Sequence, residues 1–181
     1  KNNIFTNITY FPPLGYSVKN KYNISQLQEK KYDLLFYGNI IADFKYRKKM
    51  IDGLSEFSNE KKYNFLYTDN LYDENDKNNI LKDTKIVIHV PSHENLHSFP
   101  WAKTCELMLK KVFFIIEEND EMYIQGLDNI CVYYKRNNLK DLQEKIEYYI
   151  NNSSERETIT NKCFNYIKDN FNMDSLMKQI I

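Results

Sequence analysis

Residues 85–118 read KIVIHVPSHENLHSFPWAKTCELMLKKVFFIIEE. The run at 85–90 is apolar and short, as a buried strand is, and a polar loop follows it. Pro100 then opens a helical pattern over 100–111, and a second apolar run at 112–118 predicts another strand. Two strands separated by a helix cannot pair as a hairpin, so this stretch predicts a βαβ unit with parallel strands.

The same alternation continues on both sides of this unit. We expect further strands at 32–38, 63–69 and 129–134, and helices at 41–58, 74–84, 139–152 and 154–170, with a last helical turn or two at 173–181. Right-handed crossovers between such strands give an α/β fold, namely a Rossmann-like parallel sheet with helices on both faces. Residues 1–31 contain the turn-rich FPPLGYS at 11–17, which predicts a linker, and 32–181 form the domain.

Composition excludes several classes of function. The 181 residues are enough for about one domain. Lys and Arg together number 25, as do Asp and Glu, and this neutral balance argues against a protein that coats nucleic acid or an anionic membrane. No window approaches the roughly 18 apolar residues of a transmembrane helix, and no signal peptide is visible. Because the chain opens with Lys1, we expect it to be part of a longer protein.

The three cysteines are odd in number and far apart, which favours free thiols and a cytoplasmic location. The chain has no GxGxxG, GxxxxGK[ST], GxSxG or CxxC motif, so the usual dinucleotide fold and the P-loop NTPases are excluded. His89, His93 and His97 are spaced by four, but Pro91 interrupts any helix through them. We therefore expect no metal site, and a zinc hydrolase would require the three rings to converge.

Ligands of parallel sheets bind at the carboxyl ends of the strands. On the helix at 100–111, Lys103 and Glu106 are three residues apart and share a face near its N-terminal end. A helix N-terminus and a lysine favour phosphate, and a carboxylate can accept two ribose hydroxyls. The alternative is a solvated ion pair between the two side chains.

Other candidates follow the first two strands. Gly38 either allows a ligand close to the backbone or only ends its strand. Arg47 either reaches a phosphate or belongs to a solvated cluster, KYRKK. Tyr67 and Asp69, at the end of the second strand, could contact a base. For Trp101 we favour core packing over stacking on a ligand.

Five segments in order resemble the C-terminal, donor-nucleotide-binding half of a GT-B glycosyltransferase of the group 1 or spore-maturation-like kind. They are FPPLGYS, KYDLLFYGNI with YRKKMIDGL, ILKDTKIVIHV, SFPWAKTCELMLKKVFFIIEE and CFNYIKDNFNMDSLMKQI. The fourth is similar to the family's pattern of Arg, two residues and Glu before the next strand. The chain departs from the family in having Lys103 for the arginine, MLKKVFF for a small-residue turn, and Ser98 for a first acidic residue.

The resemblance implies binding of a nucleotide sugar, such as a UDP-sugar, for transfer to a glycan or protein acceptor without a metal or other cofactor. Glu106 would hold the ribose, Lys103 and Arg47 would neutralise the diphosphate, and Gly38 would present backbone amides. The loop with His93, His97, Ser98 and Phe99 would face the donor sugar. Because the acceptor site and the base of such enzymes lie largely in an N-terminal half, we name no catalytic residue and expect these 181 residues alone to transfer nothing.

The departures at Lys103 and Ser98 leave a second hypothesis, a non-catalytic Rossmann-like module that was derived from such a transferase and mediates protein contacts. A concave polar pocket around Gly38, Lys103 and Glu106 would favour the transferase. A filled apolar surface there would favour the module.

Overall fold

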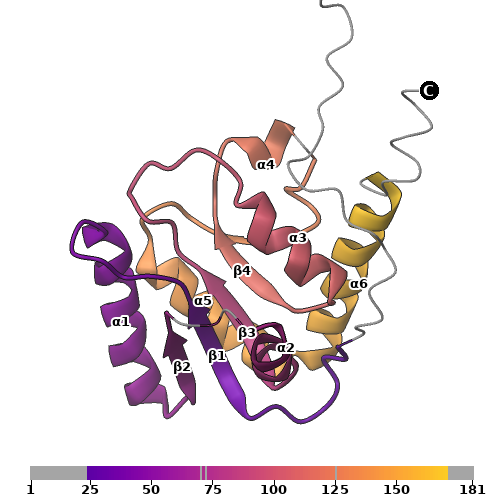
Figure 1. Ribbon diagram of the computed structural model, residues 1–181, viewed down its shortest axis with the longest axis horizontal. Helices are drawn as coiled ribbons and strands as arrows, with labels where there is room; N and C mark the ends of the chain where they lie inside the picture. The colour runs from indigo at the N-terminus through magenta and orange to yellow at the C-terminus, as the bar shows by residue number, and fades with distance from the viewer. Residues whose placement is uncertain (1–23, 70, 72, 125, 171–181) are drawn as a thin grey trace, which may run out of the picture.

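Five parallel strands form the centre of the computed structural model, which describes residues 24–69, 71, 73–124 and 126–170 (Figure 1). Their order in the sheet is β2-β1-β3-β4-β5. The strands are β1 (Tyr32–Tyr37), β2 (Phe65–Thr68), β3 (Thr84–His89), β4 (Phe114–Glu117) and β5 (Val132–Tyr134). All four strand pairs are parallel, with Leu34 of β1 opposite Phe65 of β2 on one side and opposite Ile86 of β3 on the other.

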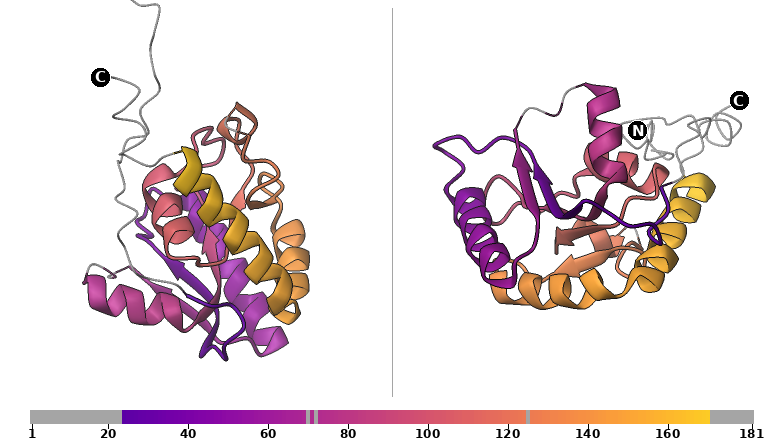
Figure 2. Two further views of the ribbon diagram at one scale, coloured as in Figure 1. Left: turned by 90° about the vertical axis from the view of Figure 1, so that its right-hand side faces the viewer. Right: turned by 90° about the horizontal axis from the view of Figure 1, so that it is seen from below.

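Helices cover both faces of this sheet, as Figure 2 shows. One face carries α1 (Lys45–Lys61) and α5 (Leu139–Asn151), and the other carries α2 (Glu74–Lys82), α3 (Trp101–Leu109) and α6 (Ser153–Asn170). A short helix, α4 (Glu121–Ile124), lies between β4 and β5. The expected fold class, a Rossmann-like parallel sheet with helices on both faces, is confirmed.

Alternation along the strands explains why both faces need a helical layer. In β3, Ile86 and Ile88 pack toward α1 and α5, while Val87 packs toward α2, α3 and α6, and all three are fully buried. Successive strand residues point to opposite faces, so an apolar run buries both. Each such side chain contributes roughly 1.5–3 kcal/mol by leaving water.

The strand order reverses between β1 and β3. From β1 the chain crosses to β2 on one side, and from β2 it returns past β1 to β3 on the other. The loops after β1 and β3 therefore lead away from each other. In open parallel sheets this point is where a crevice forms at the carboxyl edge.

Two elements differ from the expectation. The helix expected from residue 41 begins at Lys45, because residues 41–44 form a tight turn in which the Phe44 N–H bonds the Ile41 carbonyl at 2.9 Å. No helix was expected between the strands at 112–118 and 129–134, but this link contains α4, which starts where the buried Asn119 side chain accepts the Met122 N–H at 3.1 Å. FPPLGYS and the helical turns expected at 173–181 lie outside the described residues.

Residues 24–31, the end of the expected linker, pack against the domain. The Ile24 N–H bonds the Lys110 carbonyl at 3.3 Å, and the Gln26 N–H bonds the Glu157 carboxylate at 2.6 Å. Gln26 is only 1% exposed. This segment therefore fills the space beside α3 and α6. Within the described ranges, no helix combines the length and apolar character that crossing a membrane requires.

Candidate functional site

A hollow of about 390 Å³ opens at the carboxyl end of β1, beside the point where the strand order reverses. Its lining consists of Tyr37, Gly38, Asn39, Phe44, Arg47, Asp69 and Leu71. Gly38 has φ of +149°, a conformation that other residues rarely adopt, and its N–H bonds the Thr68 carbonyl at 3.0 Å. Glycine is thus required here by the backbone turn at the end of β1.

Arg47 joins the loops that follow β1 and β3. Its Nη1 donates to the Asn39 carbonyl at 2.8 Å, and its Nε donates to the Val90 carbonyl at 3.1 Å. The guanidinium also lies over the rings of Phe44, at 5.1 Å, and Phe36, at 5.7 Å. Burial lowers the pKa of Arg47, but an arginine keeps its charge at neutral pH.

Lys103 brings a second cation to the same strand end. Its Nζ donates to the Tyr37 carbonyl at 2.8 Å and lies 3.5 Å from the centre of the Tyr37 ring and 5.5 Å from that of Phe36. Burial, and then the charge of Arg47, lower the pKa of Lys103 to about 7, while Glu106 opposes the shift. Across the described part of the chain neither Arg47 nor Lys103 forms a salt bridge, so both charges face main-chain carbonyls.

Glu106 belongs to an ionic network between α2 and α3. Its carboxylate lies 2.7 Å from Nζ of Lys77 and 2.6 Å from Nζ of Lys110, and Glu74 contacts the same two lysines. Glu106 and Lys103 take different partners, so the solvated pair considered from the sequence does not form. Glu106 is still close enough to Tyr37 to help burial raise the pKa of that phenol.

The loop between β3 and α3 is mostly exposed. The His93 ring meets the Phe44 ring edge-on at 5.2 Å between centres. His97 Nδ1 lies 2.5 Å from a carboxylate oxygen of Asp120, and Ser98 lines a cavity of about 10 Å³. Of the four predicted loop side chains, His93 and His97 thus have partners from neighbouring loops.

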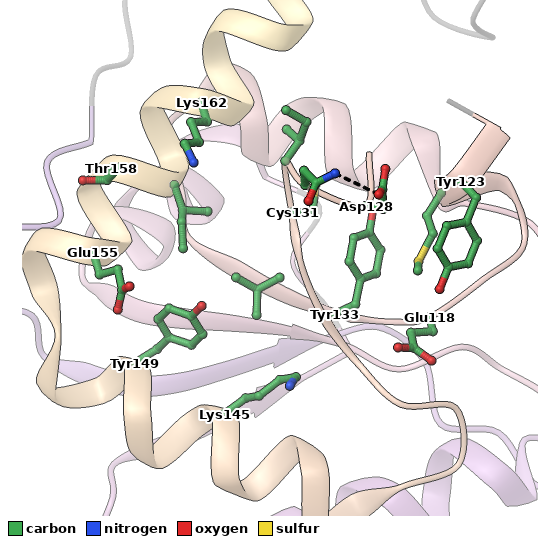
Figure 3. Close-up of a pocket in the computed structure, with 15 residues that line it drawn as sticks. Glu118, Tyr123, Asp128, Cys131, Tyr133, Lys145, Tyr149, Glu155, Thr158 and Lys162 are labelled. Atoms are coloured by element: carbon green, nitrogen blue, oxygen red, sulfur yellow. Dashed lines mark hydrogen bonds between the residues drawn. The ribbon is translucent and has the colours of Figure 1, made fainter. Parts of the chain in front are cut away.

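Tyr67 lies outside the Gly38 hollow. Its ring is 5.8 Å from that of Phe36, and it lines another hollow, of about 380 Å³, beside α1. A larger hollow, of about 560 Å³, runs along β5 at the other edge of the sheet (Figure 3). Neither of these two hollows contains Gly38, Arg47 or Lys103 in its lining.

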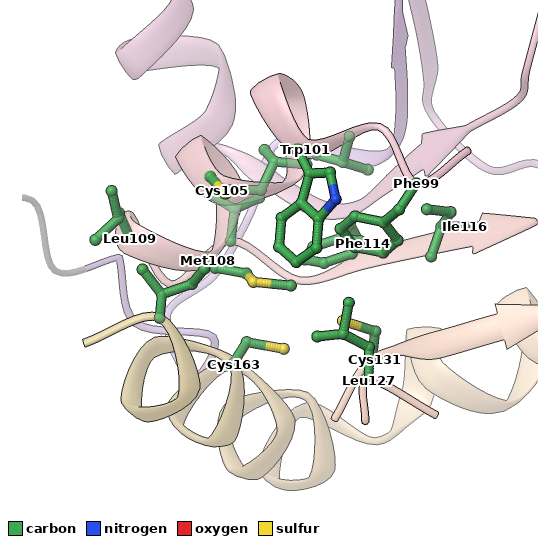
Figure 4. Packing of buried hydrophobic residues seen from close by; sticks show 14 of the residues in the cluster. Phe99, Trp101, Cys105, Met108, Leu109, Phe114, Ile116, Leu127, Cys131 and Cys163 are labelled. Atoms are coloured by element: carbon green, nitrogen blue, oxygen red, sulfur yellow. The ribbon is translucent and has the colours of Figure 1, made fainter. Parts of the chain in front are cut away.

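Phe99 lies in the core below the loop. Its side chain is 4% exposed and packs 4.6 Å from the Trp101 ring, next to Phe114 (Figure 4). Its N–H bonds the Glu121 carboxylate at 2.8 Å. Phe99 therefore fixes the loop to α3 and α4, and the ring itself is not in a position to face a donor sugar. Trp101 is a core residue, as expected.

His89 is enclosed at the end of β3. Burial, and then the charges of Lys103 and Arg47, lower the pKa of His89 well below its ordinary value, so the ring is neutral. Its neighbours His93 and His97 have the separate partners given above. Within the described ranges, no three His, Cys, Asp or Glu side chains are arranged to hold a metal ion.

Glu117 is a buried acid that sequence reasoning did not single out. It ends β4 and is 3% exposed, and it accepts hydrogen bonds from the Tyr46 hydroxyl and, at 3.4 Å, the Asn137 N–H. Burial raises the pKa of Glu117. The available signal was an acid directly after the apolar run VFFII.

The fold agrees with what family comparison finds. The chain belongs to the glycosyl transferase-like family, whose sequence profile matches residues 22–181. The predicted resemblance to a glycosyltransferase domain is thereby confirmed.

Among solved structures, the chain is similar to the crystal structure of TarM, with a TM-score of 0.57. The match has 11% sequence identity and covers 88% of this chain and 36% of the TarM chain, so it is a likeness of fold over about a third of that protein. A search of curated proteins found no match.

Proposed function

We propose that this chain is the nucleotide-sugar-binding domain of a glycosyltransferase, with the donor diphosphate bound by Arg47 and Lys103 beside the turn at Gly38, whose own N–H donates to the Thr68 carbonyl. The observation that carries this proposal is the pair of cations at the strand-order reversal, whose hydrogen bonds and ring contacts in the described chain are with main-chain carbonyls and aromatic rings and include no acid. Such charges stabilise an anion strongly because no acid already neutralises them. Open parallel sheets bind ligands at their carboxyl edge, where the strand order reverses.

The first turns of the helices support an anion at the same place. Among the helices in the described residues, α1 and α3 are the two without an acidic residue in the first turn. These are the helices that follow β1 and β3. By contrast, α2 begins with the Asp73 cap and Glu74. Helix N-termini carry partial positive charge, so a first turn without acidic side chains favours a bound phosphate.

We assign the ribose hydroxyls to Glu106. It lies on α3 one turn beyond Lys103 and is partly exposed, and Lys77 and Lys110 hold its carboxylate in place. Asp69 supplies another acceptor to the Gly38 hollow, which suits a base or ribose better than a phosphate. His93, His97 and Ser98, in the exposed loop, then face the donor sugar.

The donor is a UDP-sugar, and the leaving diphosphate is stabilised by the two cations and helix dipoles without a metal. The acceptor is a glycan or a protein, and a separate N-terminal half supplies its site. Three buried free cysteines favour the cytoplasm. The 181 residues alone bind nucleotide weakly and transfer no sugar.

One observation favours the second candidate, a non-catalytic interaction module. Glu106 is already paired with two lysines, and Lys103 with a carbonyl, so both groups have structural partners without a ligand. In addition, the concave polar hollow contains Gly38 and Arg47 but neither Lys103 nor Glu106 in its lining.

Calorimetric titration with UDP and GDP, in Mg²⁺ and in EDTA, distinguishes the transferase domain from the interaction module. For the transferase domain we expect one nucleotide to bind saturably and equally with and without the metal. Arg47→Gln should weaken binding about tenfold or more, since a charged hydrogen bond is worth roughly 1.5–3 kcal/mol. The control is Lys49→Gln, which removes the same charge from an exposed position on α1 and should change affinity less than about twofold.

Because Arg47 also joins two loops, thermal unfolding of each variant is measured alongside. Lys103→Gln gives an independent second removal of charge. No binding at millimolar nucleotide, or equal weakening by Arg47→Gln and Lys49→Gln, would contradict the proposal and favour the interaction module.

A further inference from the structure

The hollow along β5 is unrelated to the proposed nucleotide site. It measures about 560 Å³, within the roughly 300–1,000 Å³ of small-molecule sites. Figure 3 shows it between α5 and α6 on one side and α4 with the loop before β5 on the other. It shares no lining residue with the Gly38 hollow, and β3 and β4 separate β5 from β1.

Three tyrosines line this β5 hollow, namely Tyr123, Tyr133 and Tyr149. Tyr123 is 65% exposed although its ring is large and partly apolar. Tyr149 is half-buried and is held by contact with Phe113 at 4.8 Å. Aromatic faces are electron-rich, so they attract the weakly positive C–H groups on the flat side of a sugar ring.

Charged side chains of both signs also line the hollow. Glu118, Asp128 and Glu155 supply carboxylates, and Lys145 and Lys162 supply ammonium groups. An anion would meet three acids here, and a purely apolar ligand would strip water from five charged groups. A neutral molecule with many hydroxyls suits the lining best, because each hydroxyl can donate to a carboxylate and accept from a lysine.

We infer that the β5 hollow binds a neutral oligosaccharide, with Tyr123 and Tyr149 against its rings and the acids and lysines on its hydroxyls. This inference does not depend on the nucleotide site. The hollow would hold a glycan chain on the domain at a place remote from the carboxyl end of β1.

The test is saturation-transfer NMR on the purified chain, with maltotriose and triacetylchitotriose as probes. We expect saturable binding of at least one probe with a dissociation constant on the order of 1 mM, or about 4 kcal/mol. Tyr123→Ala should weaken it by about threefold to tenfold, the range for one aromatic contact. Lys162→Met should also weaken it, since it removes an exposed donor from the rim.

The matched control is Tyr67→Ala, which removes an exposed tyrosine, 41% exposed, from the opposite edge of the sheet and should leave sugar binding unchanged. Both tyrosines are exposed, so neither substitution should unfold the domain. No saturation near 10 mM sugar, equal weakening by both variants, or competition by UDP would overturn the inference. A change of sedimenting mass in Tyr123→Ala would also overturn it, because the hollow would then be covered by a second copy of the chain.

The binding of UDP to the same wild-type sample is measured as a separate experiment. Absence of sugar binding beside normal UDP binding contradicts only the β5 site. The reverse result contradicts only the nucleotide site.

Discussion

Nζ of Lys103, on α3, lies 2.8 Å from the carbonyl oxygen of Tyr37, the last residue of β1. This contact holds a lysine in a half-buried position beside another cation, and its pKa falls to about 7. The charge at this strand end is therefore complete in mild acid and partial in mild base.

The affinity for UDP should fall as pH rises through about 7, because Lys103 then loses the proton that attracts the diphosphate. Lys103→Arg should remove this loss, since arginine stays charged. We expect the ratio of variant to wild-type affinity to increase several-fold between about pH 6 and pH 8.5. Calorimetry on both proteins measures this ratio, in which the titration of UDP itself cancels. A constant ratio would mean that Lys103 does not contact the phosphates.

Stability should change with pH through the same residue. The pKa of Lys103 is about 7 in the folded chain and about 10.4 in an unfolded one, so between these values the unfolded chain holds a proton that the folded chain has lost. The free energy of unfolding therefore rises with pH across this window. Lys103→Met should flatten the rise in urea titrations, whereas Lys49→Met, at an exposed position, should not. Parallel curves for wild type and Lys103→Met would contradict the burial argument.

Glu106→Ala tests the assignment of ribose. It should weaken UDP binding about tenfold, as expected for a lost charged hydrogen bond, but leave binding of inorganic pyrophosphate unchanged. Glu74→Ala is the matched control, because it removes the other carboxylate that contacts Lys77 and Lys110. Equal losses of UDP affinity in the two variants would assign Glu106 to the α2–α3 network alone.

Lys111→Gly should stabilise the domain slightly. Lys111 has φ of +54° in the turn between α3 and β4, a left-handed conformation that costs a side-chain-bearing residue roughly 1–2 kcal/mol. Glycine removes that strain but adds about 0.5–1 kcal/mol of chain entropy. We expect a gain of about 0.5 kcal/mol in urea denaturation, and a clear loss would show that the contact of Lys111 with the Phe164 ring outweighs the strain.

Local patterns predicted most of the fold. The apolar runs predicted each strand, and their lack of alternation predicted burial on both faces, as in Ile86, Val87 and Ile88. Patterns could not predict the strand order, which depends on contacts between distant segments. The start of α1 at Lys45 and the presence of α4 were also missed, because both depend on single turns at Phe44 and Asn119.

For the site too, local patterns predicted positions along the chain but not contacts between distant segments. Helical spacing placed Lys103 and Glu106 about one turn apart on the helix that forms α3, but their partners include residues of other elements, Tyr37 from β1 and Lys77 from α2. A sequence alone does not show such partners. Glu117 was missed for a similar reason, since its burial depends on Tyr46 and Asn137 from distant segments. The roles predicted for the site residues in nucleotide binding remain predictions.

The thiols of Cys105 and Cys163 come from α3 and α6, and that of Cys131 from the residue before β5, yet all three are buried in one cluster. Burial raises the pKa of Cys105 to about 12, and that of Cys131 is raised too, so neither reacts readily while the domain is folded. A thiol reagent such as Ellman's should consequently release its coloured product only as fast as the core opens. The rate at which the colour develops therefore measures how fast the core of the domain opens. This rate can be compared between variants without an added label.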